Sequence, residues 1–384
     1  MTAWPMVTLG ELMVKRAGSV DPAKHPDESF DLYSIPAFDS GLPDVVVGAE
    51  IGSSKQVVRT GDVLLSRIVP HIRRAWVVGS ERGRRIIASG EWMVFRSDRI
   101  HAGWLRHVLV GDLFHSQLMQ TVAGVGGSLM RARPAHVATI EVPLPPLPEQ
   151  RRIAAILDHA DALRTKRREA LARLDELTQS IFIDMFGTEL ANAGGHVPLG
   201  EQLSFLTSGS RGWARYYAES GEIFLRIQNV GDDELRLRDV AYVDPPSTAE
   251  AKRTKVRVGD VVLSITADLG RTAVISEAAA GGYINQHLAI LRSDRFEPRF
   301  LSRVIASPAG QRQISAKSRG GTKAGLNFDD VRSLLVPCPD RTRQRHFVKR
   351  VENIEAIREE GLSALTELDT LFASLQSRAF RGEL

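Results

Sequence analysis

The stretch Val142–Gly187 decides the fold, and it reads VPLPPLPEQRRIAAILDHADALRTKRREALARLDELTQSIFIDMFG. It opens with Pro143, Pro145, Pro146 and Pro148. Because proline fixes φ and has no N–H, this run predicts an extended lead-in and then a helix that holds Pro148 in its first turn. Neither proline nor glycine occurs again before Gly187, and apolar residues recur three or four apart. The pattern predicts one amphipathic helix of about 55–60 Å, at ~1.5 Å per residue.

The end of the chain repeats this pattern. Val336–Leu384 reads VPCPDRTRQRHFVKRVENIEAIREEGLSALTELDTLFASLQSRAFRGEL and aligns with the first stretch at an offset of 194 residues. A lone amphipathic helix of this length needs a partner, so the shared register predicts that the two helices form an antiparallel coiled coil. The alternative is that each helix packs only on its own domain. The residues expected in the helix–helix and partner contacts are Ile153, Leu157, Leu163, Leu174, Ile181, Phe347, Val351, Ile354, Leu368 and Leu375.

The remaining sequence is also duplicated. Val58–Ser66 (VRTGDVLLS) matches Val256–Ser264 (VRVGDVVLS) at seven of nine positions, and Val7–Glu11 is echoed by Val197–Glu201. The first copy predicts strands over 62–68, 75–78 and 91–96 and a helix over 104–120; in the second copy Pro308 is expected to break the helix over 300–314. The fold class is therefore α+β: two duplicated α/β domains separated by two long helices. The expected bounds are domain 1 over 1–147, a central helix over 148–190, domain 2 over 191–339 and a C-terminal helix over 340–384.

The loops of the two copies differ although their frame is shared. Ile68–Arg74 reads IVPHIRR, whereas Ile265–Arg271 reads ITADLGR. Different loops on one scaffold indicate two binding surfaces that recognise different things.

Composition gives further limits. A chain of 384 residues has room for two or three domains. The one cysteine, Cys338, argues against a disulfide framework and fits a reducing cytosol. No secretory pattern opens the chain and no run of about 18 apolar residues occurs, so we expect a cytoplasmic protein without a membrane span. The net charge of +4 is too small to identify a polyanionic partner by itself.

These residues resemble the specificity subunits of type I restriction–modification systems. The resemblance covers essentially the whole chain. It depends on Leu144–Gln150 (LPPLPEQ) leading into a long helix, Phe186-Gly187 ending that helix, and the terminal Ala379–Leu384 (AFRGEL). The duplicated GD-[VL]-[VL]-x-S strand and a glycine–[ST] turn before each long helix support it. The second lead-in, Pro337–Arg341, departs from the pattern because it lacks the full leucine–proline run.

The resemblance implies a prokaryotic DNA-recognition subunit whose two target-recognition domains each read one part of a bipartite, asymmetric site. The paired helices would set the spacing and dock two modification subunits, which methylate adenine; restriction subunits would translocate and cleave. The chain itself would be non-catalytic, a pseudo-symmetric monomer in a hetero-oligomer. S-adenosylmethionine, ATP and Mg would be bound by the partner subunits.

Arginines and one lysine near the strand ends and glycine turns are the candidate DNA contacts, because phosphate contacts position a reader and base-edge contacts specify sequence. Solvated surface charge is the alternative for each of them. Trp213, which lies among them, is more typical of a core, and the run Lys166–Arg168 is more typical of a solvated or partner-binding face. The candidates are Arg67, Arg73, Arg74, Arg131, Arg133, Arg211, Arg215, Arg271, Arg319 and Lys323.

The sequence offers little for catalysis. Asp244–Ser247 (DPPS) lacks the aromatic residue of the adenine-methyltransferase motif, so we interpret it as a turn. Gly320–Gly325 does not fit a phosphate-binding loop, the histidines show no metal-ligand spacing, and Cys338 has no evident activating neighbour. Two other functions stay open: a coiled-coil adaptor with two protein-binding domains, and the recognition subunit of a different restriction–modification class.

Overall fold

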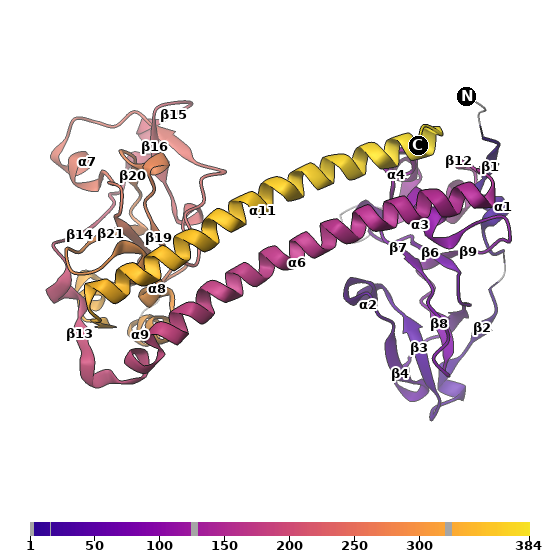
Figure 1. Cartoon of the computed structure of the whole chain (residues 1–384), viewed down its shortest axis with the longest axis horizontal. Helices are drawn as coiled ribbons and strands as arrows, with labels where there is room; N and C mark the ends of the chain where they lie inside the picture. The colour runs from indigo at the N-terminus through magenta and orange to yellow at the C-terminus, as the bar shows by residue number, and fades with distance from the viewer. Residues whose placement is uncertain (1–3, 16, 124–129, 319–324) are drawn as a thin grey trace. The chain divides into compact units, whose positions relative to one another are not determined.

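The computed structural model describes residues 4–15, 17–123, 130–318 and 325–384 (Figure 1). The chain divides into two compact units, Met1–Glu169 with Leu362–Leu384, and Ala170–Gly361. Each unit holds one copy of the duplicated domain and part of each long helix. Because the division runs through both helices, the domain bounds expected from the sequence stay a prediction.

The sheets of the first unit have the strand orders β2-β5-β8-β3-β4, β7-β6-β9, β1-β12 and β10-β11. The strands are β1 Met6–Thr8, β2 Ser19–Val20, β3 Ser29–Tyr33, β4 Asp44–Val47, β5 Lys55–Val57, β6 Val63–Ser66, β7 Ala75–Val77, β8 Arg85–Ala88, β9 Trp92–Phe95, β10 Val122–Ala123, β11 Arg131–Ala132 and β12 Glu141–Pro143. The helices are α1 Leu9–Leu12, α2 Ile35–Ser40, α3 Ala102–Val110, α4 Asp112–Gln120 and α5 Pro134–Val137, with short 3₁₀ turns at η1 Pro22–Lys24, η2 Gly48–Glu50 and η3 Pro70–Ile72.

The second unit has the strand orders β14-β21-β18-β19, β15-β17-β16-β20 and β13-β22. The strands are β13 His196–Pro198, β14 Phe205–Ser208, β15 Tyr217–Ala218, β16 Glu222–Leu225, β17 Ala241–Val243, β18 Val261–Ser264, β19 Thr272–Val274, β20 Tyr283–Ile284, β21 Leu288–Arg292 and β22 Leu335–Pro337. The helices are α7 Ala249–Thr254, α8 Pro298–Ala306, α9 Pro308–Lys317 and α10 Phe328–Arg332, with 3₁₀ turns at η5 Ala193–Gly195, η6 Leu199–Gln202, η7 Trp213–Tyr216, η8 Ile227–Asn229 and η9 Glu277–Ala279.

The two copies share a set of strand pairings, although their sheets differ in strand number and order. β6 pairs antiparallel with β7 and β9, and β18 pairs in the same way with β19 and β21. A parallel pair recurs as well, β3 with β8 and β16 with β20. The predicted duplication of one α/β fold is therefore confirmed.

The duplicated GD-[VL]-[VL]-x-S segment forms the central strand of each copy. All four residues of β6 are buried, and so are all four of β18. Val63 and Leu65 pack into one apolar cluster and Leu64 into another, so both faces of β6 are covered. A strand that is buried on both faces has a continuous apolar sequence instead of an alternating one.

The aspartate of this segment holds the same contact in both copies. Asp62 is 1% exposed and accepts two hydrogen bonds from Arg96, each 2.6 Å long. Asp260 accepts the equivalent bonds from Arg292, at 2.5 and 2.8 Å. These paired, hydrogen-bonded charges fix the start of the central strand against the end of its neighbour.

The long helices are α6, Leu147–Ala191, and α11, Arg341–Arg381 (Figure 1). α6 runs four residues past Gly187, where the sequence motif placed its end. The second helix begins within one residue of the expected position, although its lead-in is altered. The predicted single helix over 104–120 is wrong, because Gly111 separates α3 from α4; the break expected at Pro308 is confirmed between α8 and α9.

The two long helices contact each other within each unit. In the first unit Ile153 and Leu157 of α6 share a core with Ala379 of α11. Arg164 Nε lies 2.6 Å from Asp369 Oδ1, and the Arg164 guanidinium lies 4.3 Å from the centre of the Phe372 ring. The N-terminal part of α6 therefore lies beside the C-terminal part of α11, as an antiparallel pair requires.

The second unit shows the complementary contact. Phe182 and Phe186 of α6 pack on Phe347 of α11, with ring centroids 5.4 and 5.8 Å apart. A Cβ on Gly361 would lie 2.8 Å from Leu171 Cδ2, so the two helices approach closely there. The helices thus pack on their own domains and on each other, and the alternative of separate packing alone is wrong.

Burial along the expected seam is uneven. Ile153, Leu157, Phe347, Val351 and Ile354 are buried. Leu174, Ile181, Leu368 and Leu375 are half-buried. Leu163 is 42% exposed, and the neighbouring Arg164 contacts α11, so a partner contact of Leu163 stays a prediction.

Asp233 lies in the loop that precedes β17 in the second unit, and its side chain contacts α8. It accepts a short hydrogen bond from Ser302, and Arg303 Nη1 lies 3.8 Å away. Burial raises the pKa of Asp233 to about 6, because it outweighs the opposing effects of the Ser302 hydrogen bond and the nearby arginines.

Candidate nucleic-acid interface

In the first unit the loop 67–74, between β6 and β7, lies beside residues 130–132. Ile68 and Arg131 form a β-bridge, the Val69 N–H donates to Met130 O over 3.0 Å, and the Ala132 N–H donates to Arg67 O over 2.8 Å. The structure therefore brings together two segments that the sequence singled out separately. The glycine turn expected at 124–127 lies outside the described residues.

Two of the candidate arginines in this region share one carboxylate. Arg67 Nε lies 2.8 Å from Glu91 Oε2, and Arg131 Nη2 lies 3.3 Å from Glu91 Oε1. Burial tends to raise the pKa of Glu91, but the hydrogen bonds from Arg67 and Arg131 outweigh it and hold the pKa below its usual value. The carboxylate is therefore ionised at neutral pH, and the three groups together carry one net positive charge.

The loop itself has an unusual backbone. Val69 has a φ of 46° and Arg73 a φ of 27°, a region that bulky L-residues rarely adopt. Arg73 Nη1 lies 2.5 Å from Asp112 Oδ1, and this contact fastens the loop to the start of α4. The Arg74 side chain is only 12% exposed, with Nε 3.6 Å from Asp39 Oδ1. The Arg74 side chain is therefore largely covered, whereas those of Arg67, Arg73 and Arg131 are 36%, 41% and 51% exposed, each beside a carboxylate.

The second unit has an equivalent loop, 265–271, between β18 and β19. Thr266 forms a β-bridge with Gly325, and the Leu326 N–H donates to Ile265 O over 2.8 Å. Ala267 has a φ of 64°. Arg271 forms an ion pair with Asp268. The loop therefore has the same neighbours as its counterpart but a different conformation and sequence.

The side chain at one equivalent position differs between the two loops. The Arg67 N–H donates to Glu91 O over 3.0 Å, and the Ile265 N–H donates to His287 O over 2.9 Å, so Glu91 and His287 occupy equivalent places. His287 Nδ1 lies 2.5 Å from Thr266 Oγ1, where the first unit has a carboxylate between two arginines. The same frame thus presents an acid–arginine group in one copy and a histidine–threonine group in the other.

The other candidates are more scattered. Arg211 lies at the same end of the sheet as loop 265–271. Its neighbour Ser210 forms a β-bridge with Asn285, which is two residues before His287. Arg215 is exposed and lies 4.8 Å from the centre of the Tyr216 ring; Arg133 is exposed before α5. Trp213 is 6% exposed and stacks on Phe224, as expected of a core residue. Arg319 and Lys323 lie outside the described residues.

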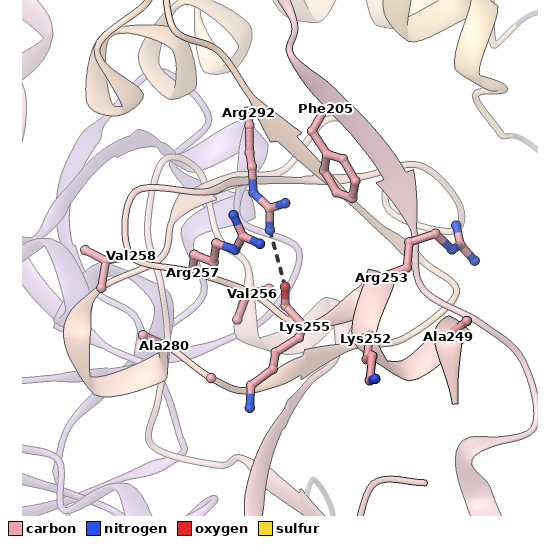
Figure 2. A pocket seen from close by; sticks show the side chains of 11 residues that line it. Phe205, Ala249, Lys252, Arg253, Lys255, Val256, Arg257, Val258, Ala280 and Arg292 are labelled. Atoms are coloured by element: carbon pink, nitrogen blue, oxygen red, sulfur yellow. Dashed lines mark hydrogen bonds between the residues drawn. The ribbon is translucent and has the colours of Figure 1, made fainter. Parts of the chain in front are cut away.

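The second unit also has a basic pocket that was not predicted, with a volume of about 680 Å³. Figure 2 shows cationic side chains from α7, from the segment after it and from the end of β21 around one hollow. Its cations are Lys252, Arg253, Lys255, Arg257 and Arg292. The run AKRTKVR over 251–257 was the available signal, but only the fold adds Arg292 and the small residues that line the pocket.

The structure also bears on other kinds of site. Among the described residues no group of three or more His, Cys, Asp or Glu side chains is arranged to hold a metal ion. In the same residues no helix is both long and apolar enough to cross a bilayer. Asp244–Ser247 leads from β17 to α7, whose N-cap is Thr248.

Fold and site together define a class: a protein with two copies of one α/β unit, joined by two long antiparallel helices, that carries a different loop surface on each copy. The comparisons narrow this class. The chain is 28% identical over 174 residues to the specificity subunit of the Escherichia coli type I restriction enzyme EcoBI, covering 43% of this chain and 36% of that one. It is 24% identical over 315 residues to the EcoKI specificity subunit of Escherichia coli strain K12, covering 74% and 66%.

A solved structure agrees in fold. A chain from a type I restriction–modification system aligns with a TM-score of 0.65 and 23% identity over 100% of this chain and 99% of that one. No family model matches the sequence. The resemblance to type I specificity subunits is confirmed, and the chain spans 36% and 66% of the length of the two curated relatives described.

Proposed function

We propose that this chain is the DNA-recognition subunit of a type I restriction–modification system. It reads a bipartite, asymmetric double-stranded site, with one half-site bound by each α/β domain at loop 67–74 and loop 265–271. One observation carries the proposal: equivalent positions, Glu91 and His287, present different hydrogen-bonding groups beside equivalent loops. A reader of one palindromic sequence would need the same groups in both copies.

In this proposal the paired helices set the gap between the half-sites. α6 has 45 residues and α11 has 41, so each is roughly 60–70 Å long at about 1.5 Å per residue. Two modification subunits, which methylate adenine, dock on the helices, and restriction subunits join them in the cytoplasm. The chain contributes no catalytic group; S-adenosylmethionine, ATP and Mg are bound by those partners.

The candidate DNA contacts follow from the loop geometry. Arg67, Arg131 and Arg211 lie at the two loop surfaces and are proposed to reach bases or phosphates. Arg133, Arg215 and Arg271 are proposed as phosphate contacts at their margins, and Arg319 and Lys323 as further contacts from the glycine turn. Arg73, whose side chain is 41% exposed beside Asp112, is proposed as a further contact, and Arg74, 12% exposed beside Asp39, as a residue that supports the first loop.

The test is a domain exchange in the assembled modification complex. Residues 1–141 are replaced by the corresponding block of a relative with a known target, and methylated sites are mapped by methylation-sensitive sequencing. We expect one half-site to change and the other to stay. A change in both halves would contradict independent reading, and a chain that binds no duplex while capturing other proteins would favour the adaptor function.

The spacing is tested separately. An insertion of seven residues in the middle of α6, with a matching insertion in α11, lengthens each helix by about 10 Å. We expect the gap between half-sites to grow, by at most about three base pairs at ~3.4 Å each, while both half-site sequences stay the same. An unchanged gap would show that the helices do not set the distance.

A further inference from the structure

The basic pocket of the second unit has more positive charge than its own carboxylates neutralise. Arg292 is compensated by Asp260, with Nε to Oδ1 at 2.5 Å. For Lys252, Arg253, Lys255 and Arg257 the described part of the chain provides no carboxylate oxygen within 4.0 Å. Four like charges around one hollow repel each other, and an anion in the hollow would relieve that repulsion.

Part of the pocket wall is made of small residues. Ala249, Ala280 and Gly281 line it with little side-chain bulk, and Gly281 has a φ of 87° that favours glycine. In Figure 2 the Arg257 and Arg292 guanidinium groups lie on one side of the hollow and Lys252 on the other, while the Arg253 side chain points away from them and contacts Thr207. Guanidinium groups bind phosphate through paired N–H donors, and ammonium groups add point charge.

The first unit lacks part of this arrangement. Lys255 forms a β-bridge with Tyr283, and Val57 pairs with Ile87 in the equivalent place, so Val57 stands where the second unit has Lys255. The same offset aligns Ser54 with Lys252, although Lys252 lies in α7 and Ser54 in a segment without a helix. Two of the uncompensated cations therefore belong to the second copy alone, although the Asp–Arg pair beneath them is shared.

The pocket lies at the opposite end of β18 from loop 265–271. β18 has four residues, so the two surfaces are separated by roughly 13 Å at about 3.3 Å per residue. That distance corresponds to about four base-pair steps. A duplex segment of this length is long enough to reach from one surface to the other.

We propose that the basic pocket binds the phosphodiester backbone of DNA beside the half-site that loop 265–271 reads. This inference rests on the proposed function and adds an asymmetry to it: the second unit carries a sequence-independent anchor that the first lacks. The anchor contributes to affinity and to salt dependence, and it does not change which sequence is preferred.

The test uses the full chain with the substitutions Lys252→Ala, Lys255→Ala and Arg257→Ala together. Arg253 and Arg292 are left in place because they contact Thr207 and Asp260. A matched control removes three exposed cations of the same unit outside the pocket, as Arg238→Ala, Arg312→Ala and Arg350→Ala. Binding to a target duplex and to a random duplex is measured across a KCl series, with melting temperature as the check on folding.

We expect the slope of log affinity against log salt concentration to become shallower by about two to three in the pocket variant, because each lost phosphate contact accounts for about 0.9. Its affinity at 0.1 M KCl should fall on the order of 100-fold for both duplexes, so that their ratio is unchanged. The control should change far less. If the triple variant does not fold, Lys252→Ala alone should lower the slope by about 0.9.

Several results would overturn the proposal. One is a control that loses as much affinity as the pocket variant. Another is a pocket variant that keeps the duplex affinity of the parent chain. If that variant is no longer stabilised by inorganic phosphate, the ligand of the pocket is a free anion. If it no longer co-purifies with modification subunits, the ligand is a protein. A parent chain that binds no duplex would reject the proposed function itself and, with it, a DNA ligand for the pocket.

Discussion

Two buried glutamines give the sharpest test of how this fold is held together. Gln150 and Gln344 are each fully buried, and they occupy equivalent places 194 residues apart at the start of the long helices. The side chain of Gln150 accepts from the His101 N–H over 2.7 Å and donates to Arg99 O and Pro145 O over 2.9 and 2.8 Å. It thereby joins α3, the proline lead-in and α6.

Gln344 repeats this role in the second unit with fewer bonds. It accepts from the Glu297 N–H over 2.8 Å and donates to Pro339 O over 3.0 Å. A net hydrogen bond contributes about 1 kcal/mol, and a buried group left without a partner costs about 1–3 kcal/mol. We therefore expect Gln150→Leu to lower the free energy of unfolding of the first unit by about 3–5 kcal/mol. Gln344→Leu should lower that of the second unit by about 2–3 kcal/mol.

Hydrogen exchange resolved by mass spectrometry measures the two units separately. The loss of about 3–5 kcal/mol expected for Gln150→Leu corresponds to a fall in amide protection of more than about 100-fold in β6. The loss of about 2–3 kcal/mol expected for Gln344→Leu corresponds to a fall of about 30- to 150-fold in β18. The control Gln179→Leu changes an exposed glutamine on α6 and should stay within about 0.5 kcal/mol. Unchanged protection of β6 in Gln150→Leu, or an equal loss in β18, would refute the reasoning.

Three further predictions concern charge and helix stability. Because the pKa of Asp233 is raised to about 6, the folded second unit retains a proton that the unfolded chain releases, so its stability falls as the pH rises from about 4 to 6. The fall should be about 1–3 kcal/mol in the free energy of unfolding, measured by urea titrations at pH 4.5 and 7.5, and Asp233→Asn should remove it. Glu91→Gln should free Arg67 and Arg131, alter the preferred sequence of one half-site only in methylation mapping, and strengthen random-duplex binding severalfold. Gly187→Ala should raise stability by about 0.5–1 kcal/mol in thermal unfolding, because Gly187 lies inside α6 and an added Cβ meets only Ile183, at 3.5 Å; no gain would show that this turn is frayed.

Local patterns predicted the frame of the molecule. The two long helices could be placed to within a few residues because apolar spacing and the absence of helix breakers act over neighbouring residues. The break at Gly111 was not predicted, because the apolar spacing of 104–120 continues across it. Leu163 fits the helical stripe, yet it is exposed, and its neighbour Arg164 contacts α11.

The candidate site was predicted less completely, because it depends on contacts between distant residues. Arg67 and Arg131 were each expected at a surface, but nothing in the sequence showed that they share Glu91. The basic pocket needs Arg292 beside Arg257, and their nearness follows from the pairing of β18 with β21.

The two copies together separate structural from functional polar groups without any alignment. The Asp–Arg pair and the buried glutamine keep their identity in both copies, and in both they satisfy backbone or charge partners inside the fold. Glu91 in the first copy corresponds to His287 in the second, and Val57 corresponds to Lys255. The side chains of each pair differ, although their backbones make equivalent contacts. A group needed for folding has the same task in each copy and cannot change freely, whereas a group that contacts a different ligand in each copy can. Internal divergence at a constant backbone position therefore supports the proposal that recognition lies at the two loops.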